Sequence, residues 1–424
     1  MDKTTKIRVS RASKSLAEAE KQRDREQEFD GPDALSAQLR LRIGELIEDL
    51  VAAELEQALE AGRYERRGES RGGYRHTWRQ RELTTSMGPT TIHLQRGRLF
   101  DAQGRPSLEW QSRLLPRYSR RAREVDDSIL AAYLSGANSR RVRTLLKPLL
   151  KTAHLSKSAV SRVVSRLKKS FEQWRTERLD GKAIAYLFLD AINVKVRTDR
   201  RVQTMPILVA MGVDATGQKE LLGLLLMNSE STAAWSLMVQ DLVARGLCEP
   251  ILCIIDGNAG LKRAVEQTWP RAQIQRCTVH KLRNLEAHCP KRSLNDLRAD
   301  YHAIVQAETE SLARKAYARF IKLWQMRSEA VARSLQEGGE DLLTYFRFPS
   351  SQWKSLCTTN AIERLNEEFR RRIKTQACMP SESSALYLFF GLYQSGQIRF
   401  HRIRGWQDLP QLWSQTPLEP ATTY

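Results

Sequence analysis

One short apolar run ends in a carboxylate, and that places a strong constraint on how the chain can fold. Residues 184–189 (Ile-Ala-Tyr-Leu-Phe-Leu) follow Gly181 and lead directly into Asp190. A run of this length and composition is typical of a central strand buried on both faces. An ionised carboxylate at its end costs free energy unless it is paired or bound to a metal. If Asp190 binds a metal, other acids of the chain are expected to lie beside it.

A second acid ends a second apolar run. Residues 251–255 (Ile-Leu-Cys-Ile-Ile) lead into Asp256 and Gly257, and a helix is expected over residues 259–268. An acid at the mouth of a strand, followed by glycine and a helix, lies where open α/β sheets place ligand-binding groups. Asp256 is the second candidate.

The third candidate, Glu363, lies in a predicted helix over residues 359–374. Apolar residues recur there at helical spacing, and Glu363 lies beside their stripe. Mg²⁺ prefers oxygen ligands and leaves positions for water and phosphate, so three acids of this kind predict a magnesium site. Taken alone, each acid is also compatible with a surface charge or a helix cap. Glu367 lies one turn further along and competes with Glu363 for the role.

The charge of the chain indicates a polyanionic partner. Its 424 residues carry 69 Lys and Arg against 49 Asp and Glu, a formal net charge of +20. Nucleic acid fits this surplus best. No apolar run approaches the roughly 20 residues of a spanning helix, and the polar N-terminus does not resemble a signal peptide. We therefore expect a cytoplasmic, nucleoid-associated protein with no membrane partner, whose six scattered cysteines are reduced thiols.

An arm and a helix are expected over residues 1–62. The first 32 residues are charged and poor in large apolar side chains, which favours a flexible arm. Between Pro32 and Ala61 a helix is predicted, with Gly62 as its stop signal. The apolar stripe that must pack against another element consists of Leu35, Leu39, Ile43, Ile47, Val51, Leu55 and Leu59.

Residues 63–118 form a predicted basic hairpin region. Its strands are expected at 82–86 and 90–95, on either side of Met-Gly-Pro. Arginines alternate with aromatic residues here, which suits phosphate contact and base stacking, although a solvated charged surface is an equal alternative. The arginines are Arg66, Arg67, Arg71, Arg75, Arg79, Arg81, Arg96 and Arg98.

Residues 119–180 are predicted to form a helix-turn-helix-like DNA-binding region. Three helices are expected: the middle one starts near Ser139, with Pro148 shortly before its end, and the third is capped by Ser156 or Ser158. In a helix-turn-helix the first residues of the second helix reach the bases. The alternative is an ordinary helical hairpin packed in a core. The residues expected to face DNA are Lys157, Ser158, Ser161 and Arg162.

The order of the remaining elements indicates an α/β fold. Strands at 204–213 and 219–227, joined by a turn at Gly217, precede a helix at 231–245, and a short strand follows at 273–277. Three antiparallel strands followed by helix, strand, helix and strand are compatible with a ribonuclease H-like core. We expect this catalytic core at 181–290 and 350–400, an α-helical insertion at 291–349 and a basic tail at 401–424.

Several of these segments together resemble a known family. In order and spacing the chain is similar to bacterial insertion-sequence transposases of the Mutator-like family, a DDE class. The matching pieces are Arg75 after Gly-Gly-Tyr, Leu-Leu-Pro-Arg-Tyr at 114–118, Ser-Lys-Ser-Ala-Val-Ser-Arg at 156–162, Tyr-Leu-Phe-Leu-Asp-Ala at 186–191, Asp-Gly-Asn-Ala-Gly-Leu at 256–261, Cys-Thr-Val-His at 277–280 with Arg283 and Asn284, and Asn-Ala-Ile-Glu-Arg-Leu-Asn at 360–366.

The resemblance implies that Asp190, Asp256 and Glu363 are the catalytic triad and the metal ligands. It also implies a helical insertion in the 107 positions between the last two (363 minus 256). Two Mg²⁺ ions, which Mn²⁺ is able to replace, would serve DNA cleavage and strand transfer, with Asp190 as the bridging ligand. The Asp-Gly-Asn sequence departs from many relatives after the aspartate, and we expect it to change loop detail only.

Two further groups are candidates for the same site. The helix of Glu363 continues with a basic face, which would hold phosphate or else be a solvated surface: Arg364, Arg370, Arg371 and Lys374. Cys277 and His280 form a Cys-x-x-His motif that the resemblance marks as a family signature of unsettled role. Zinc is the alternative there, but the next His and Cys are adjacent and lack the usual ligand spacing.

The function expected from these features is that of a transposase. Its partners would be double-stranded DNA, namely the terminal inverted repeats of the element and the target, and synapsis of two ends would need a homodimer or a higher oligomer. Two alternatives stay open. One is a DNA-binding regulator with structural acids, and the other is a structure-specific nuclease that does not join strands.

Overall fold

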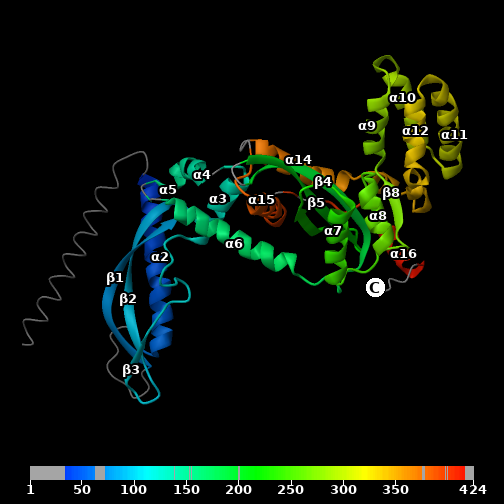
Figure 1. Ribbon diagram of the computed structural model, residues 1–424. Helices are drawn as coiled ribbons and strands as arrows, with labels where there is room; N and C mark the ends of the chain where they lie inside the picture. Colours follow the sequence, from blue (N-terminus) through cyan, green and yellow to red (C-terminus); the bar gives the residue numbers. More distant parts are fainter. Residues whose placement is uncertain are drawn as a thin grey trace, which may run out of the picture. The chain divides into compact units, whose positions relative to one another are not determined.

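A computed structural model describes residues 34–62, 72–137, 139–151, 153, 155–198, 201–374, 378–396, 398 and 400–415 (Figure 1). They form two units: the first runs to Tyr133 and includes Ala137–Val163, and the second comprises Leu134–Gly136 and the residues from Val164 onward. The arm expected before residue 33, with Arg66, Arg67 and Arg71, lies outside the described residues. The division into six segments stays a prediction.

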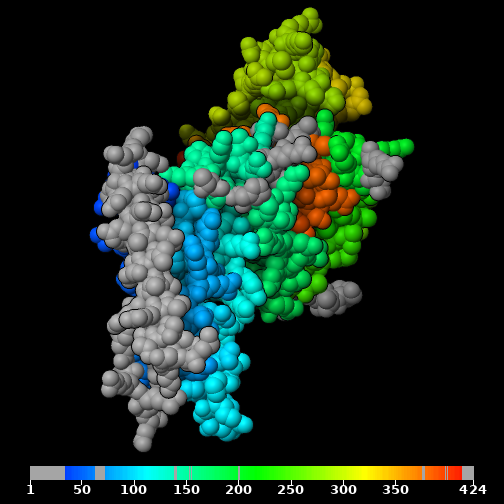
Figure 2. All heavy atoms as spheres, turned by 90° about the vertical axis from the view of Figure 1, so that its left-hand side faces the viewer, coloured from blue at the N-terminus to red at the C-terminus, as the bar shows by residue number. Residues whose placement is uncertain are grey.

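A long helix and a hairpin build most of the first unit. Helix α2 (Ala34–Leu59) packs along β2 (Gly88–Phe100), which pairs with β1 (Gly73–Thr85) in an antiparallel hairpin; the hairpin surface is light blue in Figure 2. The predicted hairpin is confirmed, but its strands are much longer than expected. A short third strand, β3 (Pro106–Glu109), completes the order β1-β2-β3.

The helix α2 is confirmed, but the prediction of one buried stripe along it is wrong. Val51, Leu55 and Leu59 are buried as expected, whereas Leu35 and Leu39 are exposed. Small residues decide the difference. The buried side contains Ala37 and Gly44, and a Cβ atom at Gly44 would lie 3.0 Å from Thr90 Cγ2. In the first half of α2 these small residues occupy the buried side, and Leu35 and Leu39 turn away from it.

Four helices follow the hairpin, where three were expected. They are α3 (Arg123–Leu134), α4 (Ser139–Leu145), α5 (Lys147–Leu150) and α6 (Lys157–Arg175). The expected middle helix is divided because Pro148 lies in the first turn of α5, where its missing N–H is tolerated, and not near a helix end. Ser156 caps α6, since its Oγ accepts a hydrogen bond from the Ala159 N–H at 3.2 Å.

A five-stranded mixed sheet is the centre of the second unit. Its order is β6-β5-β4-β7-β8: the first three strands are antiparallel, and β7 and β8 run parallel to β4. Gly217 lies in the predicted turn with φ of 79°. These strands confirm the α/β fold class. Their bounds are β4 (Ile184–Thr198), β5 (Arg201–Asp214), β6 (Lys219–Leu226), β7 (Leu252–Ile255) and β8 (Gln273–Arg276).

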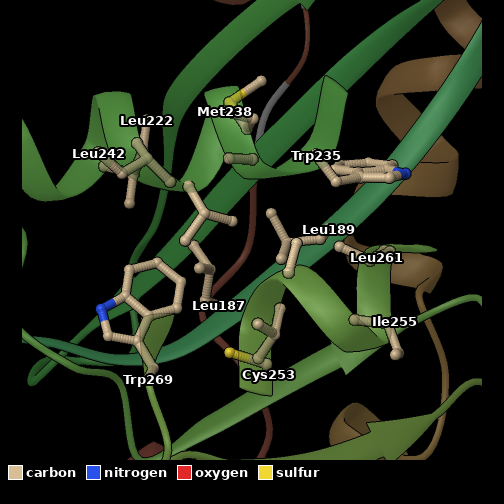
Figure 3. Close-up of a cluster of buried hydrophobic side chains, with 14 of the residues drawn as sticks. Leu187, Leu189, Leu222, Trp235, Met238, Leu242, Cys253, Ile255, Leu261 and Trp269 are labelled. Atoms are coloured by element: carbon tan, nitrogen blue, oxygen red, sulfur yellow. The ribbon is translucent and has the colours of Figure 1, made fainter. Parts of the chain in front are cut away.

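Helices pack on both faces of this sheet. On one face, Leu187 and Leu189 of β4 meet Trp235, Leu261 and Trp269 (Figure 3). These partners belong to or adjoin α7 (Thr232–Ala244) and α8 (Ala259–Thr268). The helices α14 (Asn360–Ile373) and α15 (Glu382–Gln394) also contact β4. Because side chains alternate along a strand, Asp190 points away from the side of Leu189 and toward α14.

Residues 291–349 are helical, as expected, and their role as an insertion stays a prediction. No strand occurs in residues 291–349, all of which are described, and Figure 1 shows the helices there packed with the helix at Thr278–His288 into a bundle that projects away from the sheet. Besides α14 and α15, the elements described after β8 are α9 (Thr278–His288), η1 (Lys291–Ser293), α10 (Leu294–Val305), α11 (Glu310–Arg327), α12 (Glu329–Gly338), η2 (Glu340–Leu342), η3 (Thr344–Arg347), α13 (Trp353–Leu356), η5 (Trp406–Asp408) and α16 (Leu409–Gln415). Among the described helices, none has the length and apolar character needed to cross a membrane.

Candidate active site

Asp190 lies on β4 where the strand changes from fully buried to half-exposed. Its side chain is only 6% exposed. Oδ1 accepts a hydrogen bond from the Ala191 N–H at 2.9 Å, and Oδ2 accepts one from Asn366 Nδ2 at 3.0 Å. The carboxylate is therefore held in one orientation by its own strand and by α14.

Asp256 lies next to Asp190 because of the strand register. Leu189 of β4 pairs with Ile255 of the parallel strand β7, so the two aspartates follow paired residues. The Asp256 carboxylate accepts a hydrogen bond from the Asn258 N–H at 2.9 Å. Gly257 between them has φ of 99°, and a Cβ atom there would lie 2.4 Å from an Arg276 nitrogen. The turn after β7 therefore requires glycine.

Glu363 enters from the first turn of α14. Its Oε1 lies 4.0 Å from His280 Nε2 and 3.7 Å from Arg283 Nη1. The pKa of Asp190 is raised to about 6: burial is the largest cause and the charges of Asp256 and Glu363 add to it, whereas the Ala191 N–H and the charge of His280 oppose it. The structure thus brings the three predicted acids into one electrostatic environment.

The donor chemistry suits a hard divalent cation, but the side chains are not arranged as a finished metal site. Within the described ranges, no three His, Cys, Asp or Glu residues are grouped so that they could hold a metal ion. Glu363 is turned toward His280 and Arg283 instead. Carboxylates that repel one another at a buried position are what a cation would neutralise. Closing the site around a cation would require Glu363 to turn toward Asp190.

Cys277 and His280 form a hydrogen-bonded pair beside the acids. Burial raises the pKa of the Cys277 thiol, but hydrogen bonds to His280 and Thr359 outweigh it and the net pKa is lowered. Hydrogen bonding to Cys277 raises the pKa of His280 to about 9 despite burial. Thr359 connects the pair to α14, since its Oγ1 lies 3.4 Å from the sulfur and 3.5 Å from His280 Nδ1. All six cysteines are free, as expected.

Sequence reasoning missed three polar residues of this site. Asn366 is 1% exposed and occupies the apolar face of α14, and an Asn within an apolar stripe was the signal that could have revealed it. Glu230 lies before α7, where burial and the charge of Asp256 raise its pKa and a hydrogen bond from Asn193 lowers it. No sequence signal marked Glu230 or Asn193.

Most basic residues of α14 are exposed, and two of them are paired with an acid of the same helix. Arg371 Nη1 lies 2.9 Å from Glu368 Oε1, and Arg372 also pairs with Glu368. The face is therefore less positive than its composition suggested. The predicted phosphate-binding residues are all on its exposed side: Arg364, Arg370, Arg371 and Lys374.

In the first unit, one predicted DNA contact has a structural role. Arg75 donates hydrogen bonds to the Ala61 and Gly62 carbonyl oxygens, each at 3.1 Å, and its Nη2 lies 3.3 Å from Glu56. It thus closes the C-terminal end of α2. The four residues predicted to face DNA are exposed at the start of α6: Lys157, Ser158, Ser161 and Arg162.

Comparison with known proteins defines one class for this chain, the transposases. The chain belongs to the Mutator family of transposases, whose sequence pattern matches residues 11–401. It is 34% identical to the transposase for insertion sequence element IS1081 of Mycobacterium tuberculosis over 351 residues, 82% of each chain. It is 32% identical to that for ISRM5 of Rhizobium meliloti, covering 84% of this chain and 86% of the relative. Identity to that for IS256 in transposon Tn4001 of Staphylococcus aureus is 31%, covering 77% and 82%.

Proposed function

We propose that this chain binds the terminal inverted repeats of an insertion sequence and catalyses Mg²⁺-dependent DNA cleavage and strand transfer, with Asp190, Asp256 and Glu363 as its catalytic triad. The observation that carries the proposal is the geometry: Asp190 and Asp256 follow paired residues of adjacent parallel strands, and the first turn of α14 holds Glu363 close enough for its charge to raise the pKa of Asp190. A regulator that only bound DNA would have no need of a buried Asp190 repelled by two further carboxylates.

The strand order β6-β5-β4-β7-β8, with three antiparallel strands and two parallel ones, supports a ribonuclease H-like core. In that arrangement the ends of β4 and β7 are adjacent, and a helix near the C-terminus of the core supplies the third acid. The helices between β8 and α14 are then an insertion that leaves the catalytic sheet intact.

Asp190 would hold both metal ions, and Asp256 and Glu363 would each complete the ligands of one. When bound, Mg²⁺ supplies activation of the attacking hydroxyl and charge relief on the phosphate and the leaving oxygen; Mn²⁺ is able to replace it. The chain contributes orientation. Asn366 and the Ala191 N–H hold the Asp190 oxygens, and Arg283 and His280 place positive charge beside Glu363, where a phosphate would enter.

DNA would contact both units. The exposed start of α6 and the hairpin provide the sequence-reading surface, and the basic side of α14 holds phosphates next to the acids. Two ends must be brought together for strand transfer, so we propose a homodimer or a higher oligomer. Such a protein would work on chromosomal DNA, in the cytoplasm and with the nucleoid.

The test is a cleavage and strand-transfer assay on labelled DNA that carries the ends of the flanking element, with Mg²⁺ or Mn²⁺ and with EDTA. We expect Asp190→Asn, Asp256→Asn and Glu363→Gln each to abolish joined product while binding of the ends persists. Glu367→Gln is the matched control, since Glu367 is exposed one turn along the same helix. Its activity should equal that of the wild type.

Each of the other possible outcomes would contradict one part of the proposal. An active triad variant excludes that residue from the triad. Cleaved but unjoined DNA in the wild type would indicate a structure-specific nuclease, and specific binding with no chemistry would indicate a regulator. Activity that survives EDTA would exclude the metal.

A further inference from the structure

Helix α2 has an apolar face on each side. The side that meets the hairpin contains Val51, Leu55 and Leu59. The opposite side carries leucines that no described part of the chain covers. They are Leu35, Leu39, Leu46 and Leu50, which are 71%, 41%, 59% and 50% exposed. At about 100° per residue, these four leucines fall within about 60° of one another around the helix. An exposed apolar stripe of this kind marks a protein interaction site.

The spacing of this stripe is that of a coiled-coil seam. From Leu39 onward, apolar or small residues alternate at steps of four and three, and a glutamine ends the series. Such a heptad pattern faces a second helix of the same kind along its length. The seam consists of Leu39, Ile43, Leu46, Leu50, Ala53 and Gln57.

The charges beside the seam select the direction of the second helix. Arg40 and Arg42 flank its first half, and Glu54 and Glu56 flank its second half. In a parallel pair Asp49 would lie beside Glu54 of the other helix twice, which repels, whereas the antiparallel pair has one such contact, between the two copies of Asp49. In an antiparallel pair the basic half of each helix faces the acidic half of the other, so opposite charges set the orientation.

One register satisfies both the seam and the charges. If Leu46 faces Leu50 of the second copy, Ile43 faces its Ala53 and Leu39 its Gln57. The same alignment brings Arg42 beside Glu56 and Arg40 beside Glu54 of the second copy. Glu54 already accepts a hydrogen bond from the Arg113 N–H at 2.6 Å, and Glu56 pairs with Arg75. Because both glutamates already have partners within their own chain, the charge contacts between the two chains set the orientation of the helices and add little to the binding free energy.

We propose that α2 pairs with α2 of a second copy of this chain in this antiparallel register. The N-terminal arm is a poorer occupant: its 33 residues hold five large apolar side chains, at Met1, Ile7, Val9, Leu16 and Phe29, and of these only Val9 and Leu16 follow a heptad spacing. The pairing specifies the interface of the dimer in the proposed function. It does not depend on the chemistry at Asp190.

The first test is the mass of the full-length chain in solution without DNA, by light scattering across a dilution series. We expect a dimer for the wild type and a monomer for the double variant Leu46→Glu, Leu50→Glu, with the dissociation constant raised at least about 100-fold. Leu237→Glu is the matched control, because Leu237 on α7 is 52% exposed. It should stay dimeric. A monomeric wild type, or a dimeric double variant, overturns the proposal.

A second test fixes the direction and does not require the charged variant to fold. Chains with Leu46→Cys are mixed with chains with Leu50→Cys under mild oxidation, and cross-links are mapped by mass spectrometry. We expect disulfides between positions 46 and 50 of different chains and few between two copies of position 46. Cross-links between two copies of position 46 would establish a parallel pair, and links to the arm would show that the arm covers the seam; either overturns the proposal. Neither test measures strand transfer, so the proposed dimer interface and the proposed catalytic function can be contradicted independently of each other.

Discussion

Asn366 Nδ2 donates a hydrogen bond to Asp190 Oδ2 at 3.0 Å, across 176 positions of the chain. Both side chains are buried, and Asn366 is three residues after Glu363 on α14. One helix therefore supplies an acid to the site and also fixes the orientation of another. A shift of α14 would therefore move Glu363 and release Asp190 at the same time.

Removal of this hydrogen bond should impair catalysis more than folding. We expect Asn366→Ala to lower the single-turnover strand-transfer rate by about 10–100-fold, as is usual for groups that orient metal-binding carboxylates. The rate should recover in part at high Mg²⁺ concentration, because a misoriented Asp190 still has its charge. Glu367→Ala, at the next, exposed position, is the control. Equal rates for the two variants would contradict a positioning role of Asn366.

The stability of the metal-free protein should depend on pH through Asp190. Its pKa is raised from 3.8 to about 6, chiefly by burial. A carboxyl with a raised folded-state pKa stabilises the fold below its unfolded pKa, and this contribution is lost as pH rises through about 6. Relative to Asp190→Asn, the wild type should therefore lose up to about 3 kcal/mol between about pH 4 and pH 7. Urea unfolding of both chains measures the difference, and a constant difference across this range would contradict the raised pKa.

His280 should titrate near pH 9. Its pKa is raised to about 9, first by the hydrogen bond with Cys277. The stability that this pair contributes is complete below about 6.5 and is lost as pH rises through about 9. NMR of isotope-labelled histidine rings follows the titration, and His280→Gln identifies the signal among seven histidines. Cys277→Ala should move the pKa toward 6.5, whereas Cys357→Ala, at a neighbouring thiol, should not.

Two arginines of the first unit should separate stability from DNA binding. Arg75→Ala removes the hydrogen bonds to the Ala61 and Gly62 carbonyls and should destabilise the first unit by about 1–3 kcal/mol. Arg162→Ala, on the exposed start of α6, should leave stability within about 0.5 kcal/mol and weaken DNA binding. The salt dependence of DNA binding by Arg162→Ala should correspond to the release of about one counterion fewer than in the wild type.

Hydrogen exchange at the end of α2 and DNA titrations at several salt concentrations measure these effects. Faster exchange at Leu59 is expected only for Arg75→Ala. If Arg75→Ala instead weakened DNA binding and left exchange unchanged, its predicted role in DNA contact would be favoured over the capping role.

The strands and the positions of the first two acids could be predicted because both signals are local. An apolar run that ends in Asp190 or Asp256 can be recognised without knowledge of the partner strand, and parallel pairing then brings the two ends together. The remaining features depend on packing between distant segments. Nothing near Glu230 in the sequence indicates that Asp256 will lie beside it, and the contact of Asn366 with Asp190 requires α14 to pack on β4.

The errors in the first unit have a similar cause. Apolar residues cover two sides of α2, so periodicity alone could not decide which side packs on the hairpin, and small residues such as Gly44 decided it. In the same way, Arg75 belongs to a block of similar arginines. Only the folded hairpin shows that it is the one next to the end of α2.

The 176 positions between Asp190 and Asn366 also have a consequence for protein synthesis. At about 5–20 residues per second, a ribosome needs roughly 10–35 s to proceed from one to the other. During this interval β4, β7 and the insertion have emerged, but the helix that carries Glu363 and Asn366 has not. Under the proposed function, nascent and prematurely terminated chains would therefore hold the elements proposed to read DNA but would neither cut nor join it, and a chain would acquire its complete set of acids only when translation is nearly finished.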